Sequence, residues 1–354
     1  MKNKNKIQQE AINAHIEIGC KSIIGLSVGM GKTKIAIDRV KALREINPDA
    51  KILFTGARNV YINNLKDELK KWDCDAINID MICNKSLLNY IEHYDLIIYD
   101  EAHKEASLVY HFLLKLIEIN PDVEILGLTG TPIPEHEIYS ILPISYTYLL
   151  NDAVDNQFLN NFGITIVRHD LTRQEHKMYD YLYSNYKSCI SSSKYSPDLS
   201  KLKVFLNNLQ SKTDLVNELI NTKFKDEKLL IYAGSIDQAK DIPVLQYNSK
   251  MPKKEKDLSY ETFYHSKADK LVNVGMLKES VSIPNLKYGM VTGIESSQSS
   301  KIQLIGRFCR LTIEETSHIY FFVARGTIEE KWVLNGLDNF KDKIRTIDIY
   351  QNGK

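Results

Sequence analysis

Short runs of apolar residues alternate with amphipathic stretches through the first half of the chain. Each apolar run is continuous, which is typical of strands buried on both faces of a parallel sheet. The stretches between them, such as residues 34–43 and 63–72, repeat their apolar positions with the period of a helix. The pattern predicts an α/β, doubly wound fold with strands at residues 22–26, 51–56, 95–100 and 123–130.

A second series of apolar runs follows, and two sheets imply two domains. The pattern breaks between about residues 133 and 170, so we expect a first domain at 1–150, a linker at 151–170 and a second domain at 171–354. The Ser-rich stretch 188–200 indicates an exposed loop between two helices. The strands of the second domain are expected at residues 228–234, 242–247, 270–277, 288–293 and 318–324.

Length, charge and cysteine content narrow the class of protein. The chain has 354 residues, of which 43% are hydrophobic, enough to fill two cores. Lys and Arg number 46 against 45 acidic residues, so a polyanion site requires a local basic lining. The five cysteines form no CxxC pair, which argues against a zinc site or a disulfide framework.

These features also predict where the protein works. The amino terminus has no apolar signal segment, and no stretch approaches the roughly 18 apolar residues of a membrane span. We therefore expect a cytoplasmic protein without membrane contact. Its Asn-, Lys- and Tyr-rich composition suits an AT-rich bacterial or phage genome.

The stretch LSVGMGKT, residues 26–33, lies between a predicted strand and a predicted helix. Gly29 and Gly31 let the backbone close around phosphates, Lys32 reaches the terminal phosphates, and the Thr33 hydroxyl can hold Mg²⁺. Leu26 stands where phosphate-binding loops usually have Gly or Ala, which alters the entrance of the turn. The alternative is an ordinary Gly-containing turn before a helix, but the order of strand, GKT and helix favours the phosphate loop.

A buried strand ends in two consecutive carboxylates within IIYDEAH, residues 97–103. Asp100 is placed to hold Mg²⁺ and Glu101 to orient the attacking water, which is the division of roles that phosphoryl transfer to water requires. The alternative is a solvated helix start with Asp100 as its N-cap.

Two further motifs complete the set. LTGTP, residues 128–132, ends the next strand, where open α/β sheets bind ligands, although alone it is an ordinary turn. QLIGRFCR, residues 303–310, is expected on a helix of the second domain, with Arg307 and Arg310 sharing a face with Gln303 and close to Gly306. A basic helix face is the alternative, whereas a pair of arginines in a second domain has the form of an arginine finger.

With these four motifs in this order, nearly the whole chain resembles superfamily 2 helicases and translocases. VRHDLTRQEHKMYDYL (167–182), LLIYAGS (229–235) and GTIEEKW (326–332) are similar to Swi/Snf-type ATPases, and MLKESVSIPNL (276–286) is closer to phage and restriction motors. The resemblance implies two RecA-like domains with the ATP site in the cleft between them and ATP and Mg²⁺ as cofactors. It implies that Lys32, Asp100, Glu101, Arg307 and Arg310 are catalytic, that Thr33 and Asp100 are metal ligands, and that Gln8, Gly29, Met30, Gly31, Lys32, Thr33, Gln303 and Gly306 bind the nucleotide.

The resemblance also implies coupling and nucleic-acid contacts. His103 would couple hydrolysis to the Thr129, Gly130 and Thr131 segment. Small hydroxyls and basic residues at strand ends would grip the nucleic-acid strand, and the candidates are Thr55, Arg58, Ser235 and Thr292; each could equally be an ordinary strand-end residue. Ser280 and Ser282 stand where the phage and restriction branch usually has Gly and Asp, and Arg58 where Pro is common, so the details of this coupling differ from the family pattern.

Two functions fit these residues. The first is an ATP-driven nucleic-acid motor, with DNA favoured over RNA, working as a monomer and compatible with an accessory protein. The second is a nucleotide-gated switch that clamps nucleic acid or a protein with little turnover. The intact set of Lys32, Asp100, Glu101, Arg307 and Arg310 favours the motor, because a switch could lose Glu101 or an arginine without harm.

Overall fold

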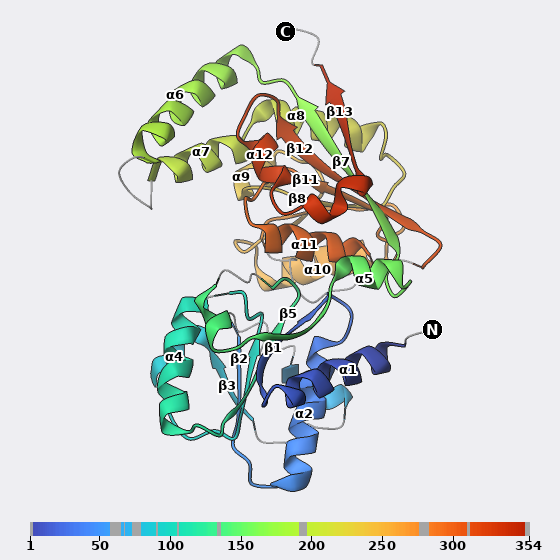
Figure 1. Ribbon diagram of the computed structural model, residues 1–354. Helices are drawn as coiled ribbons and strands as arrows, with labels where there is room; N and C mark the ends of the chain where they lie inside the picture. The colour runs from blue at the N-terminus through green and yellow to red at the C-terminus, as the bar shows by residue number, and fades with distance from the viewer. Residues whose placement is uncertain are drawn as a thin grey trace. The chain divides into compact units, whose positions relative to one another are not determined.

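The computed structural model describes residues 3–56, 65–66, 68–72, 79–89, 91–104, 106–132, 136–190, 197–275, 283–309 and 312–350. The chain divides into two compact units, Met1–Phe158 and Leu159–Lys354 (Figure 1). We call them the first and the second unit and describe each by itself.

The first unit is built on a six-stranded parallel sheet in the order β3-β2-β4-β5-β1-β6. Every pair of neighbouring strands is parallel, so the chain needs a crossover connection between one strand and the next. The central strands are buried along almost their whole length, as continuous apolar runs predict. The strands are β1 (Lys21–Leu26), β2 (Ile52–Gly56), β3 (Asp80–Cys83), β4 (Leu96–Asp100), β5 (Glu124–Thr129) and β6 (Ile144–Tyr148).

Helices cover this sheet and supply its core. On α4 (Ala106–Ile119) the residues Val109, Phe112, Leu113 and Leu116 are completely buried. Their spacing of i, i+3, i+4 and i+7 places them on one face of the helix, packed in one cluster with residues of β4 and β5. The other helices are α1 (Lys4–Glu17), α2 (Lys32–Ile46), η1 (Asn84–Asn89), η2 (Glu137–Ser140) and α5 (Leu150–Asp155).

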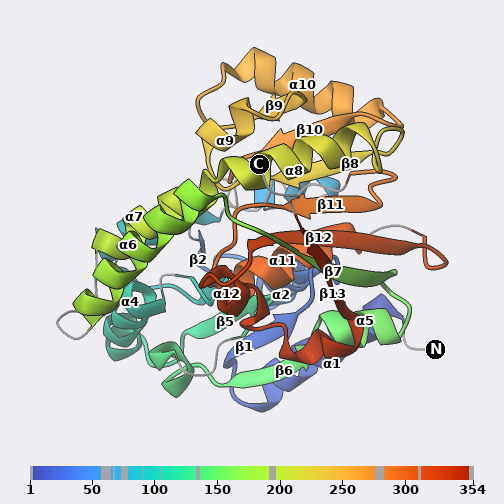
Figure 2. The same cartoon turned by 90° about the horizontal axis from the view of Figure 1, so that it is seen from above.

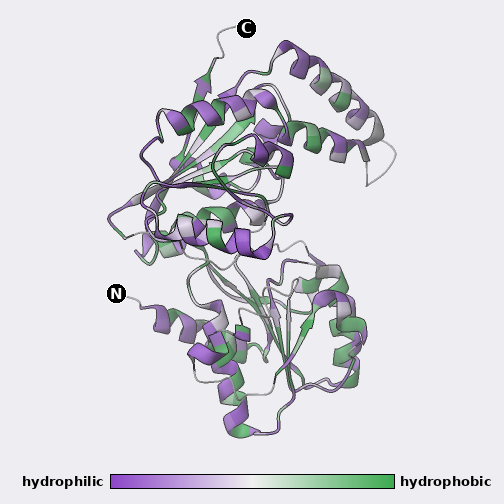
Figure 3. Ribbon diagram, turned by 180° about the vertical axis from the view of Figure 1, so that it is seen from behind, coloured by the Kyte–Doolittle hydropathy of each residue, from purple (hydrophilic) through white to green (hydrophobic). Residues whose placement is uncertain are grey.

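The second unit contains a seven-stranded parallel sheet in the order β13-β7-β12-β11-β8-β10-β9. Figure 2 shows the strands side by side in this order. The central strands of this sheet are mostly hydrophobic, whereas the helices carry many hydrophilic residues (Figure 3). The strands are β7 (Asn161–His169), β8 (Leu229–Tyr232), β9 (Leu245–Tyr247), β10 (Lys270–Asn273), β11 (Tyr288–Val291), β12 (Thr316–Ala324) and β13 (Ile344–Ile349).

Helices of the second unit likewise pack against its sheet and contribute to its core. A core cluster joins α8 to β8, β10, β11 and β12. The helices are α6 (Arg173–Ile190), α7 (Pro197–Asn207), α8 (Gln210–Asn221), α9 (Ile236–Lys240), α10 (Lys253–His265), α11 (Gln298–Phe308), α12 (Glu329–Leu334) and η3 (Asp338–Lys343). Among the described residues, none of these or the earlier helices combines the length and apolar character that crossing a membrane requires.

The predicted α/β class with two parallel sheets is confirmed, but the expected linker at 151–170 differs from the structure. Residues 161–169 form β7, which pairs along its full length with β12 and for six residues with β13. The boundary between the two units falls between residues 158 and 159 of the chain, and residues 150–155 form α5. The segment read as a linker therefore supplies an inner strand of the second sheet, because its apolar residues find partners far along the chain.

Candidate nucleotide site

The loop after β1, predicted to bind phosphates, contains two glycines in left-handed conformations. Gly29 and Gly31 have φ values of 84° and 89°, in the left-handed region that residues with a Cβ avoid. Gly31 precedes α2 without a side-chain cap, so the first turn of this 15-residue helix presents N–H groups to an incoming anion. Met30, at the centre of the loop, is completely buried and its N–H donates to the Ser27 carbonyl at 3.2 Å. The phosphate-binding role of this segment stays a prediction.

Lys32, the first residue of α2, reaches back across the loop. Its Nζ donates to the Leu26 carbonyl at 3.3 Å. A Cβ built on Gly130 would lie 3.4 Å from the same Nζ, so the ammonium lies beside the turn that follows β5. Thr33, next on α2, is half-buried. The cation expected to meet the terminal phosphates is thus held at the mouth of the loop.

Asp100 ends β4, directly beside the ends of the strands that carry the other motifs. In the sheet register Asp100 lies opposite Leu128, and Gly25 lies opposite Thr129. Burial, and then repulsion from the Glu101 carboxylate, raise the pKa of Asp100 well above its usual range, while Lys32 offsets part of that shift. A divalent cation would stabilise ionised Asp100, and carboxylate and hydroxyl oxygens are the ligands that Mg²⁺ prefers. The donor chemistry of Asp100 and Thr33 therefore fits the expected metal.

Glu101 adopts a left-handed backbone conformation with φ of 54° and is 9% exposed. Its N–H donates to Asp100 Oδ1 at 2.9 Å, and the next N–H, of Ala102, donates to the Leu128 carbonyl at 2.9 Å. A non-glycine residue in this region is strained, and such strain persists only where the surroundings impose it. β5 thus fixes the turn that carries the expected water-orienting carboxylate.

His103 joins this turn to the segment after β5. Its Nδ1 lies 2.8 Å from Thr129 Oγ1 and 3.4 Å from Glu101 Oε2. Thr129 Oγ1 in turn accepts a hydrogen bond from the Thr131 N–H at 3.1 Å. A continuous chain of polar contacts therefore runs from Glu101 through His103 to the residues predicted to couple hydrolysis to movement.

Gln8 lies on α1 and contacts the phosphate loop from the side. Its Nε2 donates to the Met30 carbonyl at 2.9 Å, and the side chain is buried. Lys4 Nζ donates to the neighbouring Gly29 carbonyl at 3.2 Å. The structure gathers in the first unit the predicted residues Gln8, Gly29, Met30, Gly31, Lys32, Thr33, Asp100, Glu101, His103, Thr129, Gly130 and Thr131.

In the second unit, α11 carries residues 303–308 of the predicted arginine motif. Gln303 and Arg307 are buried on this helix, four residues apart and so on one face, and Gly306 is also buried. Arg310 lies outside the described residues. The role of these residues in nucleotide hydrolysis stays a prediction.

Of the four nucleic-acid candidates, Thr55 and Thr292 are buried and Ser235 is half-buried. The Thr55 hydroxyl is completely buried and donates to Asn84 Oδ1 at 2.8 Å, and the Thr292 hydroxyl is buried and donates to Gln238 Oε1 at 2.7 Å. Ser235 is half-buried and caps α9, accepting from the Gln238 N–H at 3.0 Å. Arg58 lies outside the described residues, and so do Ser280 and Ser282. The contact role of all four candidates remains a prediction.

Sequence reasoning missed Gln238, which holds the ends of two strands together. Its Oε1 accepts from the Thr292 hydroxyl and from the Gly234 N–H at 3.0 Å, which joins the end of β11 to the end of β8. The side chain is 2% exposed. Its place in the first turn after an N-capping Ser235 was the available signal.

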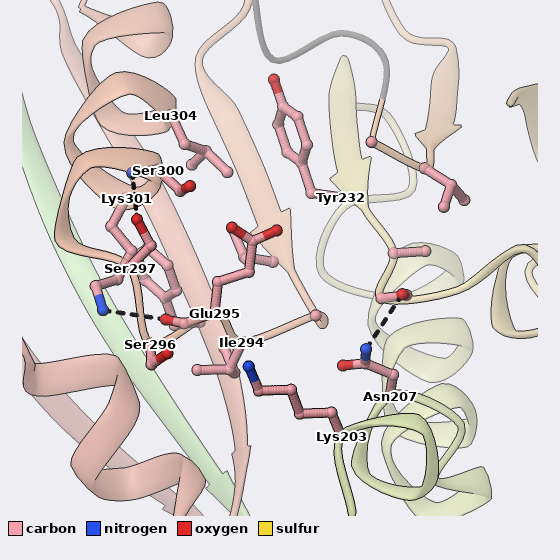
Figure 4. A pocket seen from close by; sticks show the side chains of 17 residues that line it. Lys203, Asn207, Tyr232, Ile294, Glu295, Ser296, Ser297, Ser300, Lys301 and Leu304 are labelled. Carbon is pink, nitrogen blue, oxygen red and sulfur yellow. Dashed lines mark hydrogen bonds between the residues drawn. The ribbon is translucent and has the colours of Figure 1, made fainter. Parts of the chain in front are cut away.

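A cavity of about 410 Å³ opens in the second unit at the carboxyl ends of β8, β10 and β11 (Figure 4). Lys203 from α7 and Glu295 extend into it, and Tyr232 lies on its wall. Asn207 donates to the Gly234 carbonyl at 3.2 Å, and Ser297 caps α11. The cavity therefore lies at the ends of the strands where open α/β sheets bind their ligands.

A model of the helicase conserved C-terminal domain matches residues 200–312, which run from α7 to the end of α11. Three solved structures share the fold over nearly the whole chain. The Hef helicase domain of Pyrococcus furiosus is 14% identical, with a TM-score of 0.57 over 94% of this chain and 99% of its own. Dbp5 of S. cerevisiae bound to RNA and ADP BeF3 is 13% identical, with a TM-score of 0.59 over 98% of this chain and 90% of its own. The restriction-modification enzyme LlaBIII bound to DNA is 14% identical, with a TM-score of 0.63 over 100% of this chain and 32% of its own.

The chain is thus similar to superfamily 2 helicases and translocases, through the helicase domain model over residues 200–312 and through the shared fold. Among curated relatives, a Saccharomyces cerevisiae protein named as an ATP-dependent helicase, IRC3, is 22% identical over 84% of this chain. The transcript termination protein A18 of vaccinia virus (strain Ankara) is 24% identical over 82% of this chain. The chain spans 43% of the first relative's length and 59% of the second's. The predicted resemblance to superfamily 2 is thereby confirmed.

Proposed function

We propose that the chain is a nucleic-acid-dependent ATPase of the superfamily 2 type that converts ATP and water to ADP and phosphate and uses the reaction to move on or remodel nucleic acid. The observation that carries the proposal is the convergence of Lys32, Asp100 and Glu101 at the carboxyl ends of β1 and β4, beside the turn after β5. Lys32 can bind the phosphates, Asp100 can hold the metal ion, and Glu101 can orient the attacking water.

In this proposal the phosphate loop and Lys32 bind the phosphates, and Thr33 and Asp100 hold Mg²⁺, which neutralises charge on the phosphates when bound. Glu101 orients the attacking water and accepts its proton. Gln8 recognises the adenine base. Arg307 and Arg310 of the second unit stabilise the charge that develops on the transferred phosphoryl group, and Gln303 and Gly306 contribute to nucleotide binding.

The proposed partner is nucleic acid, with DNA favoured. The support is the resemblance of residues 276–286 and 326–332 to DNA-translocating branches; one structural neighbour has bound DNA and another bound RNA. The His103–Thr129–Thr131 contacts support a role in passing the state of Glu101 to the rest of the unit. We propose that the chain works as a monomer, that an accessory protein can join it, and that it acts in the cytoplasm.

The test is steady-state phosphate release with no nucleic acid, single-stranded DNA, duplex DNA and RNA at matched salt. We expect turnover to rise strongly with at least one DNA form and less with RNA. The competing proposal is a nucleotide-gated switch. It predicts tight, nucleotide-dependent nucleic-acid binding with turnover that stays near zero in all four conditions, and this result would replace the motor.

A further inference from the structure

Glu124 is a buried carboxylate and the first residue of the inner strand β5. It lies at the amino ends of the strands, whereas the phosphate loop follows the carboxyl end of β1. Glu124 is 8% exposed, and both its oxygens are engaged. Arg39 of α2 donates to Oε1 from Nε at 2.9 Å and to Oε2 from a terminal nitrogen at 2.7 Å, and His15 Nε2 lies 3.1 Å from Oε1. One carboxylate therefore ties α1, α2 and β5 together.

His15 extends this cluster to two more strands. The ring is completely buried, and its Nδ1 lies 2.7 Å from Ser22 Oγ on β1. The Ser22 hydroxyl donates to Ser145 Oγ on β6 at 2.8 Å. The cluster, which we define as His15, Ser22, Arg39, Glu124 and Ser145, contacts every element that supports the nucleotide site except β4.

The cluster holds α1, α2 and the strands together by hydrogen bonds and does not form a metal site. Cys20 lies close enough to His15 and Glu124 for the three to share an ion. The Arg39 guanidinium, however, already occupies both Glu124 oxygens, and Ser22 occupies His15 Nδ1. Burial alone would raise the pKa of Glu124, yet the hydrogen bonds from His15 and Arg39 hold it below its usual range, so the carboxylate is ionised and satisfied.

The other end of α1 contacts the phosphate loop. Gln8 donates to the Met30 carbonyl and Lys4 to the Gly29 carbonyl. Gln8, Ala11, Ile12 and His15 are all buried, and their spacing places them on one face of α1. Gln8 and His15 are two helical turns apart, roughly 10 Å along a rigid helix. A shift at His15 therefore moves Gln8 relative to the loop.

We infer that His15, held by Glu124 and Arg39, is a specificity-determining positioning residue that sets base selectivity by fixing Gln8 against the phosphate loop. The inference rests on the proposed function, in which Gln8 recognises adenine. Recognition by hydrogen bonds needs side chains held to a fraction of an ångström by supporting contacts. Phosphate contacts come from the loop itself, so loosening α1 weakens discrimination between bases more than binding of the phosphates.

The experiment compares the affinities of the full chain for Mg·ADP and Mg·GDP by titration calorimetry, which needs no turnover. His15→Asn keeps a polar group near Ser22 but is too short for Glu124, whereas the amide of His15→Gln can reach Glu124. We expect the ADP to GDP preference to fall about three- to tenfold in His15→Asn, the range that one hydrogen bond is worth, and to return in His15→Gln. Leu116→Ala on α4, which lowers stability without touching the cluster, should leave the preference unchanged.

A double-mutant cycle with Gln8→Ala separates the possible failures. Gln8→Ala alone should abolish the preference, and adding His15→Asn should change it no further. A Gln8-dependent preference that His15→Asn leaves intact would overturn the positioning role while sparing the proposed function. A wild-type chain that binds neither nucleotide, or a preference that Gln8→Ala leaves intact, would overturn the assignment of the base site and the inference with it.

Discussion

Glu101 shows at the scale of one residue how the fold prepares chemistry. Its left-handed backbone costs on the order of 1–3 kcal/mol, and the hydrogen bonds from the Ala102 N–H to Leu128 and from the Lys104 N–H to the Glu101 carbonyl hold it there. The same turn places the Glu101 carboxylate near His103 and beside Asp100. The strain is thus located at the residue that we propose to orient water.

Lys32 and Glu101 should fail in different ways. Lys32→Ala removes the cation at the loop mouth and should abolish productive ATP binding. Glu101→Gln keeps the shape of the side chain but not the proton acceptor, so it should retain binding and lose about 10²–10⁴-fold in turnover. Titration of Mg·ATP and phosphate release measure the two effects. Equal loss of affinity in both variants would contradict these roles.

We expect His169 to make the stability of the second unit depend on pH. It is completely buried at the end of β7, and burial, with Lys212 nearby, lowers its pKa to about 4. Its unfolded pKa is about 6.5, so the unfolded chain binds more protons between those values and the free energy of unfolding falls as pH drops through this window. The loss approaches the order of 3 kcal/mol below pH 4.

His169→Gln should therefore flatten the acid dependence. Urea unfolding of the wild type and the variant at pH 7.5 and pH 5 gives the free energy of unfolding at each pH. The wild type should lose more stability between the two values than the variant, whatever the variant costs at pH 7.5. Parallel losses would show that His169 is not protonated in unfolding.

At the scale of the element, continuous apolar runs could be predicted and long-range pairings could not. The runs 22–26, 95–100 and 123–130 match β1, β4 and β5 because strands buried on both faces carry their signal locally. β13, by contrast, has mostly exposed or half-buried residues and gains its partner β7 from about 180 residues earlier. Only the assembled sheet identifies it as a strand.

The same distinction applies to the site. The loop, the carboxylates and the turn after β5 were predictable, since their residue types and spacing reflect their chemistry. The cluster around Glu124 was not, because His15, Arg39 and Glu124 are scattered in sequence and meet only through packing. The buried hydroxyls of Thr55 and Thr292 likewise depend on Asn84 and Gln238, which no motif marks.

We propose that Lys203 of α7 contacts a phosphate of the nucleic-acid backbone in the second unit. Lys203 extends into the cavity at the strand ends (Figure 4). Lys203→Ala should weaken DNA binding and lower the slope of log affinity against log salt by about one, as loss of one phosphate contact does. Lys253→Ala, at the exposed start of α10, is the matched control and should leave the slope unchanged. An unchanged slope in Lys203→Ala would remove the cavity from the nucleic-acid path.

At the scale of the whole molecule, the proposal requires both units for one reaction. Arg310→Ala, and to a lesser degree Arg307→Ala, should slow ATP turnover while leaving DNA affinity nearly intact. Arginine fingers stabilise transition-state charge and are worth on the order of 10³-fold or more. Turnover at saturating ATP and DNA measures the effect, with the Lys253→Ala variant as the control. Wild-type turnover in both arginine variants would show that α11 acts elsewhere.

The central claim is that ATP hydrolysis by this chain depends on nucleic acid. The most direct measurement is the rate of phosphate release by the wild type at saturating Mg·ATP, with and without saturating DNA, beside Glu101→Gln as the inactive control. The account predicts at least roughly tenfold stimulation by DNA in the wild type, because a ligand that favours the active conformation raises its population, and no stimulation in Glu101→Gln. A wild-type rate that is the same with and without DNA and RNA, or that Glu101→Gln matches, would contradict it.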